Sequence, residues 1–175
     1  MFKKNIITIF ALLILPLQLF SQNNKNDNPV SISFQAGYLL PQSTDGPNQS
    51  LKGGLELKPS VYKKISKSIT ALFDFIYSEH KYKTGYDKGL RIYRLINFGF
   101  RFYPRTPEKF YLKPSIGYSL DENYSSFPGL NFGVGSDFKI GRNIDIVGEA
   151  EIFFRLFDSS AISFSISGGV KYNFF

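Results

Sequence analysis

The chain has 175 residues, enough for one domain, and a formal net charge of +7. It contains no cysteine, which excludes disulfides, a lipid-modified cysteine and cysteine-ligated zinc or iron–sulfur sites. With a single histidine as well, the sequence predicts no metal and no cofactor. The lysines and arginines are scattered rather than gathered in runs, which argues against a nucleic-acid partner. The 11 tyrosines and 19 phenylalanines suit β-strands and membrane interfaces.

The first segment, residues 1–21, has the pattern of a secretory signal peptide. Lys3 and Lys4 precede an almost unbroken apolar stretch from Ile6 to Leu15, and Ser21 supplies a small residue for cleavage. The stretch is shorter than the roughly 20 apolar residues of a membrane-spanning helix. We expect cleavage after Ser21, which lowers the net charge to +5, followed by a short disordered lead-in over residues 22–29.

Residues 30–175 alternate between apolar and polar side chains, and turn signals separate the alternating runs. Alternation with a period of two is the signature of β-strands. The pattern predicts eight strands: Val30–Leu40, Gly53–Lys64, Ser68–Glu79, Leu90–Tyr103, Phe110–Leu120, Leu130–Ile140, Ile144–Leu156 and Ala161–Phe174.

Strand and connection lengths favour an outer-membrane barrel over a soluble sandwich. The predicted strands are about as long as the 9–11 residues of a tilted membrane-spanning strand. The connections Ile65–Lys67 and Gly141–Asn143 are tight, whereas Pro41–Lys52, His80–Gly89 and Asp121–Gly129 are long and polar. Short turns at one end and long loops at the other are typical of such barrels. We therefore predict an all-β fold, an eight-stranded antiparallel up-and-down transmembrane β-barrel with its long loops outside the cell.

The end of the chain, Gly168-Gly169-Val170-Lys171-Tyr172-Asn173-Phe174-Phe175, resembles the C-terminal strand of outer-membrane barrel proteins. Together with the signal peptide, the chain is similar over its whole length to the small eight-stranded group typified by OmpX and the OmpA barrel. The resemblance implies a location in the cell outer membrane of a Gram-negative bacterium. It also implies that Tyr172, Phe174 and Phe175 form the assembly signal that the barrel-insertion machinery reads. Lipid and lipopolysaccharide are the other partners expected, and we expect the barrel to be monomeric.

The polar face of the strands carries the candidate site, a network of charged side chains in the barrel lumen. Its predicted members are Lys58, Asp74, Arg101, Lys113, Asp137, Lys139, Asp145, Glu149, Glu151, Arg155 and Lys171. Hairpin register taken from the loop centres places Lys58 opposite Asp74, Lys113 opposite Asp137 and Lys139 opposite Asp145.

Two roles remain open for this polar face. In the first, the side chains fill the lumen, because eight strands leave room for little else. In the second, Glu149 and Glu151 line a narrow path for ions or small solutes. Both acids face small residues on the neighbouring strands, so their partners must come from across the lumen, and Arg101 and Lys171 are candidates.

Other functions have weaker support. A barrel enzyme that modifies lipid A would need a nucleophile, a base and an acid together, but Ser78 and Glu79 point to opposite faces beside His80. We expect His80 to be a solvated loop histidine and the protein not to be an enzyme. A soluble lipocalin-like carrier would reverse the two faces. The function predicted is a structural or surface-interaction role in the outer membrane.

Two further features concern individual strand residues. Pro59 and Pro114 each follow a Leu-Lys pair inside a predicted strand, which suggests β-bulges there. Aromatic residues gather near the strand ends as two predicted girdles at headgroup depth. The inner girdle comprises Phe102, Tyr103, Phe110, Tyr111, Tyr172, Phe174 and Phe175, and the outer girdle Tyr77, Tyr82, Tyr93, Tyr118 and Phe157.

Overall fold

The computed structural model describes residues 29–43, 52–81, 90–104, 109–121, 127–156 and 161–174. The predicted signal peptide, most of the lead-in and Phe175 lie outside these residues. Among the described residues, no helix is long and apolar enough to cross a membrane.

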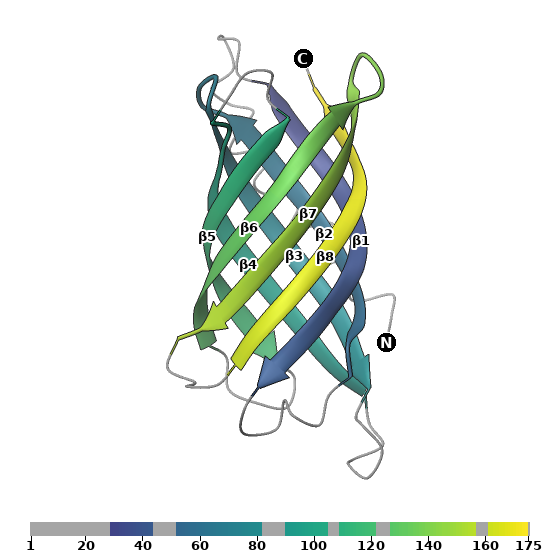
Figure 1. Ribbon diagram of the computed structural model, residues 1–175, viewed down its shortest axis with the longest axis vertical. Helices are drawn as coiled ribbons and strands as arrows, with labels where there is room; N and C mark the ends of the chain where they lie inside the picture. The colour runs from purple at the N-terminus through teal and green to yellow at the C-terminus, as the bar shows by residue number, and fades with distance from the viewer. Residues whose placement is uncertain are drawn as a thin grey trace.

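Eight antiparallel strands make up the described chain (Figure 1). Their bounds are β1 Val30–Ser43, β2 Gly54–Lys64, β3 Ile69–Lys81, β4 Leu90–Phe102, β5 Phe110–Asp121, β6 Phe127–Lys139, β7 Ile144–Arg155 and β8 Ala161–Asn173. Three strands reach two or three residues further than the sequence predicts. Strand β1 continues to Ser43, β3 continues to Lys81, and β6 begins three residues early at Phe127.

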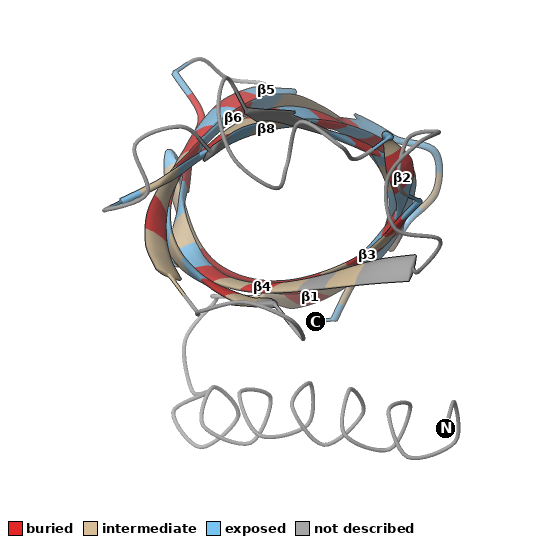
Figure 2. Cartoon of the chain, turned by 90° about the horizontal axis from the view of Figure 1, so that it is seen from below, coloured by how far each residue is buried: buried red, intermediate tan, exposed pale blue. Residues whose placement is uncertain are grey.

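The sheet closes on itself. Each strand pairs with its neighbours in chain order, and β8 pairs with β1 over thirteen positions, from Ser31 opposite Asn173 to Ser43 opposite Ala161. Viewed along its axis, the sheet is a continuous ring (Figure 2). The predicted fold class, an eight-stranded up-and-down barrel, is confirmed. Closure leaves no unpaired sheet edge, which a lipid environment would penalise.

The two faces of the sheet have opposite chemistry, as the alternation predicts. Inward-facing Ser33, Gln35 and Lys171 are buried, whereas outward-facing Phe34 and Ile166 are 58% and 71% exposed. This places charged and hydroxyl groups in the lumen and aliphatic and aromatic groups on the outer surface. A lipocalin-like carrier would have the reverse arrangement, so that alternative does not fit.

The barrel has two distinct ends, which we call the turn end and the loop end. The turn end carries the tight turns after β2 and β6 and the close of β8 (top of Figure 1). These turns are held by backbone hydrogen bonds, from Ile65 N to Ile69 O at 2.9 Å and from Ile140 N to Ile144 O at 3.0 Å. At the loop end, the residues between β1 and β2 and between β3 and β4 lie largely outside the described chain.

The two strand prolines do not form bulges, so that prediction is wrong. The register of β2 is unbroken across Pro59, with Leu57 opposite Tyr77 and Ser60 opposite Asp74. Pairing with β3 is missing only at the proline and at the residue before it, whereas pairing with β1 continues. Pro114 interrupts only the β4 side of β5 in the same way. Proline lacks an N–H, so each strand loses part of one ladder without gaining a residue.

Candidate functional site in the barrel lumen

Glu149 and Glu151 of β7 are the acidic centre of the lumen. Both are buried, and they lie opposite Gly135 and Gly133 on β6 and opposite Ser167 and Ser165 on β8. Small neighbours leave both carboxylates free to extend toward the far wall. The sequence predicts this placement, and the structure shows it.

Two lysines from the far wall meet these carboxylates. The Lys58 ammonium of β2 bonds to both Glu149 and Glu151. The Lys113 Nζ of β5 lies 3.1 Å from Glu149 Oε2 and 2.7 Å from Glu151 Oε1. Both lysines are fully buried. Each belongs to a Leu-Lys-Pro-Ser tetrapeptide, so the repeat delivers a lysine to the same two carboxylates from two strands.

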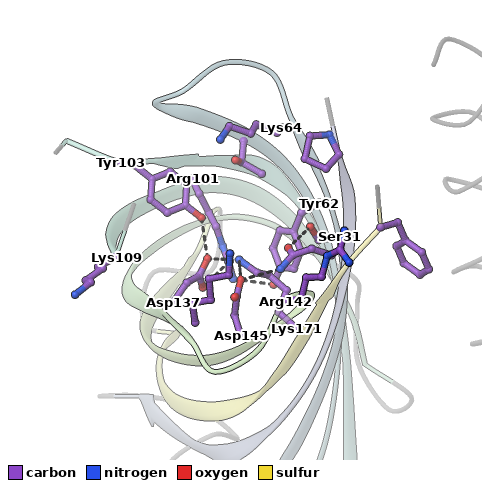
Figure 3. Close-up of a pocket in the computed structure, with 15 residues that line it drawn as sticks. Ser31, Tyr62, Lys64, Arg101, Tyr103, Lys109, Asp137, Arg142, Asp145 and Lys171 are labelled. Atoms are coloured by element: carbon purple, nitrogen blue, oxygen red, sulfur yellow. Dashed lines mark hydrogen bonds and ion pairs between the residues drawn. The ribbon is translucent and has the colours of Figure 1, made fainter. Parts of the chain in front are cut away.

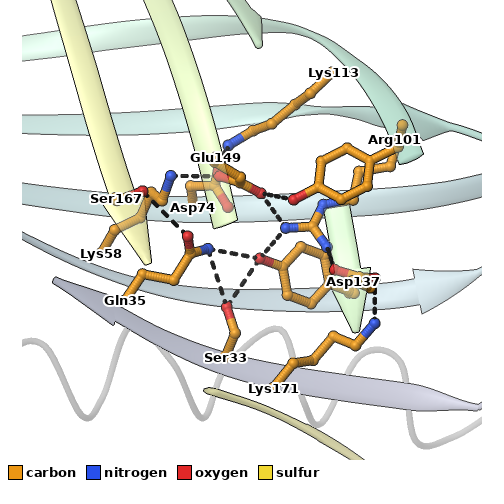
Figure 4. A network of polar contacts seen from close by, with 12 residues as sticks. Ser33, Gln35, Lys58, Asp74, Arg101, Lys113, Asp137, Glu149, Ser167 and Lys171 are labelled. Carbon is orange, nitrogen blue, oxygen red and sulfur yellow. Dashed lines mark hydrogen bonds and ion pairs between the residues drawn. The ribbon is translucent and has the colours of Figure 1, made fainter. Parts of the chain in front are cut away.

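Arg101 of β4 completes the cationic side of this group (Figure 4). Its guanidinium bonds to Glu149 and donates to Tyr62 Oη at 2.7 Å. The guanidinium carbon lies 3.9 Å from the centre of the Tyr62 ring and 4.1 Å from that of Tyr111, so the cation is held between two aromatic faces. Tyr111 also donates to Glu149 Oε1 at 2.6 Å.

Asp74 of β3 balances the charge. Its Oδ2 lies 2.5 Å from Lys113 Nζ, and the residue is fully buried. We call the resulting group the central network: Lys58, Asp74, Arg101, Lys113, Glu149 and Glu151. Three cations meet three acids, which is the condition under which buried charges are tolerated.

Hydrogen bonds extend the central network to the remaining walls. Asn131 of β6 donates to Glu151 Oε2 at 2.5 Å. Ser167 of β8 donates to Gln35 of β1 at 3.1 Å, and Gln35 lies 3.4 Å from the Tyr62 hydroxyl. Every strand of the barrel therefore contributes a side chain to one connected set of polar contacts.

A second ionic group lies toward the turn end. Lys171 bonds to Asp137 and lies 2.9 Å from Asp145 Oδ2, and Arg101 Nη1 lies 3.4 Å from Asp137 Oδ1. The Tyr103 hydroxyl donates to Asp137 Oδ2 at 3.1 Å. Tyr103 follows the end of β4, and burial raises the pKa of its hydroxyl above the ordinary value, so it stays protonated and able to donate. Arg101 joins this group to the central network.

Two of the three predicted cross-strand pairs are wrong. Asp74 lies opposite Ser60 rather than Lys58, a displacement of two residues. Lys113 lies opposite Gly133, four residues from Asp137. In the β2–β3 hairpin the tight turn is centred one residue later than predicted, since β3 begins at Ile69 rather than Ser68. In the β5–β6 hairpin the register is displaced because β6 begins three residues early, at Phe127. The third pair, Lys139 opposite Asp145, is present as predicted.

Two predicted members lie apart from both the central network and the second ionic group. Lys139 is exposed at the turn end of β6, beside the opening of the lumen. Arg155 is half-buried at the loop end of β7, opposite Gly129. It lies six residues beyond Glu149, about 20 Å along the strand.

An apolar layer lies next to the central network on its loop side. Ile76 of β3, Leu95 of β4 and Phe153 of β7 are buried and in contact. All three point inward, against the general rule that the inner face is polar. The lumen therefore has a layer of charges and a layer of hydrocarbon in series.

Several lumen residues were missed by sequence reasoning. Glu56 has the inward parity of Lys58 and is fully buried, and neither carboxylate oxygen has a hydrogen-bond partner among the described residues. Parity alone would have identified it. Tyr62 and Tyr111 share the inward parity too, but the sequence prediction places Tyr111 in the inner aromatic girdle and gives Tyr62 no role. The glycine at 135 is the counterpart of Tyr111, because a Cβ there would lie 2.5 Å from the tyrosine hydroxyl.

His80 is not a solvated loop residue, so that expectation is wrong. It lies in β3, is 1% exposed, and faces the lumen. Its Nε2 lies 3.0 Å from Ser78 Oγ and its Nδ1 3.0 Å from the Lys52 carbonyl oxygen. Glu79 points outward and accepts a hydrogen bond from Tyr77 at 2.6 Å, so it stays out of this pair as predicted. Within the described residues, no cluster of three or more potential ligands could hold a metal ion.

Some of the predicted girdle and closing-strand aromatics lie on the outer face, and others face the lumen. Tyr172 and Phe174 are each 41% exposed on the outer face, with ring centres 5.0 Å apart. Tyr103 and Tyr111 are buried and face the lumen, so they do not belong to a girdle. Phe175, Tyr82 and Phe157 lie outside the described residues.

The closed ring, the apolar outer face and the charge-filled lumen are the architecture of the small eight-stranded transmembrane barrels of bacterial outer membranes. Solved structures of that class are similar to this chain. Neisserial surface protein A matches with 13% identity and a TM-score of 0.67, over 85% of this chain and 100% of that one. The outer membrane protein AlkL in lipid bilayers matches with 11% identity and a TM-score of 0.60, over 85% and 91%.

The attachment invasion locus protein Ail of Yersinia pestis, solved with the heparin analogue sucrose octasulfate, is also similar. It matches with 16% identity and a TM-score of 0.55, over 83% of this chain and 99% of that one. At these identities the likeness is one of fold. No family model matches the sequence, and no curated protein sequence matches it.

Proposed function

We propose that this protein is an integral outer-membrane barrel with a structural or surface-interaction role, in which the loop end faces outside and the lumen is closed. The observation that carries the proposal is the lumen itself. Six charged side chains satisfy one another across it, and an apolar layer lies against them. Such an interior stabilises the wall and opposes the passage of ions.

The outer face supports the membrane setting. Phe98, Phe132 and Ile116 are more than half exposed, and in water so many large apolar groups would favour aggregation. In a bilayer they contact acyl chains. The partners that follow are outer-membrane lipid, lipopolysaccharide around the loop end, and the insertion machinery that engages β8. We propose a monomer, since the closed sheet leaves no edge strand for another copy to extend.

A non-enzymatic role is part of the same proposal. The one histidine is buried and bonded to Ser78 and to a backbone carbonyl. Glu79, the carboxylate next to this pair in the sequence, points outward and accepts a hydrogen bond from Tyr77. The histidine and its two partners hold the loop end of β3 against the start of β2, since Lys52 precedes β2.

Fractionation and conductance measurements test the proposal together. We expect the protein in the outer-membrane pellet of a Gram-negative host, and we expect it to migrate faster on a denaturing gel when unheated. In planar bilayers, purified protein should give no steady channels. Recovery in the soluble periplasm would overturn the membrane role, and steady ion-selective channels would overturn the closed lumen in favour of a narrow pore.

A further inference from the structure

Glu56 of β2 is a buried carboxyl group outside the central network. It is 1% exposed, and neither of its carboxyl oxygens has a hydrogen-bond partner among the described residues. It lies opposite Gly37 on β1 and opposite Ser78 on β3. Lys58 is the next inward residue of β2 toward the turn end. Glu56 therefore lies on the loop side of the charged layer.

Apolar side chains lie beside Glu56 on both neighbouring strands. On β3, the inward residue next to its partner Ser78 is Ile76, a member of the apolar layer. On β1, the nearest inward residue on the loop side is Leu39, which is buried as well. Ser165 of β8 lies opposite Leu39, and its hydroxyl is also buried without a hydrogen-bond partner among the described side chains. Glu56 thus borders the apolar layer, with hydrocarbon and hydroxyl groups beside it.

The charged and titratable groups that face Glu56 come from its own strand and from three others: Lys58 on β2, His80 on β3, Lys113 on β5 and Glu151 on β7. Its described neighbours on β1 and β8 carry no charge. The two lysines are bonded to other carboxylates, and the histidine is bonded to Ser78. Every cation near Glu56 is therefore already engaged with another acid.

With Glu56 included, the middle of the lumen contains four acids and three cations. Each cation is bonded to acids of the central network, as Lys58 is to Glu149 and Glu151. An ionised Glu56 would be a buried carboxylate without an ion-pair partner. Such a charge is so costly that a buried group ordinarily takes up a proton instead.

The acids at the turn end are in a different situation. Asp137 and Asp145 line a cavity of about 550 Å³, and both are bonded to Lys171 (Figure 3). Asp145 also accepts a hydrogen bond from Asn173 at 3.0 Å. An ion pair and hydrogen bonds stabilise the ionised forms of these acids, whereas the described residues give Glu56 neither.

We propose that Glu56 binds a proton in the folded barrel and that the barrel loses stability as rising pH removes this proton. The site depends on the closed lumen proposed above, since a water-filled pore would hydrate an ionised carboxylate. A protonated carboxyl group is an O–H donor, and the Ser78 and Ser165 hydroxyls are the acceptors beside it. In the unfolded chain a glutamate releases its proton near about pH 4.3. Above that pH the folded state holds one proton more than the unfolded state, so stability falls as the pH rises.

Infrared spectroscopy detects the bound proton through the C=O stretch of a protonated carboxylic acid. The barrel is refolded in a detergent without ester groups, so that no lipid carbonyl absorbs near this band. The test variant is Glu56→Gln, and the matched control is Glu79→Gln, which removes the same group from the outward face of β3. At about pH 7, well above the ordinary range of a glutamate, we expect the band in the wild type and in the control but not in Glu56→Gln. Unheated gel mobility checks folding, and Glu56→Leu, which suits the apolar layer, serves if the glutamine variant does not fold.

Urea titrations at a series of pH values measure the effect of the proton on stability. Above about pH 5, the folding equilibrium constant of the wild type should fall relative to that of Glu56→Gln by up to roughly tenfold per pH unit, the effect of one bound proton. The control should keep the wild-type response.

A wild type without the infrared band, or a Glu56→Gln protein that keeps it, would overturn the proposal. An equal pH dependence of stability in the wild type and Glu56→Gln would assign that dependence to another group, such as His80, and would overturn it as well. Steady channels in planar bilayers would instead overturn the closed lumen, while the band still decides whether Glu56 holds a proton.

Discussion

At the scale of the residue, Lys113 forms ion pairs with three carboxylates, more than any other described cation of the lumen. It is the described ion-pair partner of Asp74, while Glu149 and Glu151 also have Lys58. Replacing Lys113 therefore leaves Asp74 as an uncompensated buried charge. Removal of one member of a buried pair costs much more than removal of both members.

We expect Lys113→Met to lower the free energy of unfolding by about 3–5 kcal/mol. Adding Asp74→Asn should recover part of that loss, since the stranded charge is then gone. The chain has no tryptophan, so urea titration followed by unheated gel mobility is the suitable measurement. Lys139→Met on the exposed rim is the control and should change stability by less than about 0.5 kcal/mol. A double variant no more stable than Lys113→Met would show that Asp74 is not the group left unpaired.

At the same scale, sequence reasoning located residues better than it located partners. The inward parity of Glu149 and Glu151 and their small neighbours follow from alternation and a tight turn. The contacts of Lys58 and Lys113 do not, because they span the lumen between strands distant in sequence. Such contacts depend on barrel closure, diameter and shear, which no local pattern encodes.

At the scale of the element, the strands are defined by their outer faces. Phe132 lies near the middle of β6, 54% exposed, with its ring 6.5 Å from that of Phe154 on β7. Leu55 is still more exposed, but lies at the loop end of β2. The same substitution at the two sites therefore tests depth in the bilayer.

Phe132→Arg should make folding into lipid vesicles less favourable by roughly 2–4 kcal/mol, and Leu55→Arg by about 0–1 kcal/mol, because the cost of a charge falls from the midplane to the interface. Refolding titrations into vesicles measure both values. Equal costs at the two sites would mean that the apolar face does not span the hydrocarbon layer as the strands suggest.

Strand β8 has the additional task of closing the ring. Phe174 continues its backbone contact with β1, donating from its N–H to Val30 O at 2.9 Å. Deleting Phe174 and Phe175 should reduce the outer-membrane yield at least severalfold, because the insertion machinery would meet a strand without its aromatic end. Phe174→Leu, which keeps an apolar end, is the control. Normal yield from the truncated chain would remove the predicted assembly signal.

The number and order of the strands could be predicted from the sequence, but their ends and two registers could not. Alternation marks the central part of each strand, whereas β1 and β3 continue past it into polar sequence, as at Ser43 and Lys81, and β6 begins before it at Phe127. Residues there pair through the backbone, and no alternating apolar face is required. The β5–β6 register inferred from the loop centre is shifted by the unseen extension of β6, and the β2–β3 register is shifted because β3 begins one residue later than predicted.

At the scale of the whole molecule, the proposed closed lumen has two seals, the central network and the layer of Ile76, Leu95 and Phe153. Shortening side chains in one seal leaves the other in place. We therefore expect neither Phe153→Ala alone nor Glu149→Ala with Glu151→Ala to conduct in planar bilayers. The triple variant should give measurable channels if it folds, which unheated gel mobility checks. Steady conduction by the Phe153→Ala protein would mean that the charged layer admits ions by itself.

The distribution of charge among the strands also bears on how the barrel is made. Two of the three acids of the central network belong to β7, near the end of the chain, while the cations that neutralise them belong to β2, β4 and β5. A C-terminal hairpin that entered the hydrocarbon alone would carry two bare carboxylates, at a cost of several kcal/mol for each. The neutral interior exists only when strands from both halves of the chain are present. We therefore expect membrane entry and ring closure to be one cooperative event. Either half of this barrel should be stable in lipid only when the other half is present.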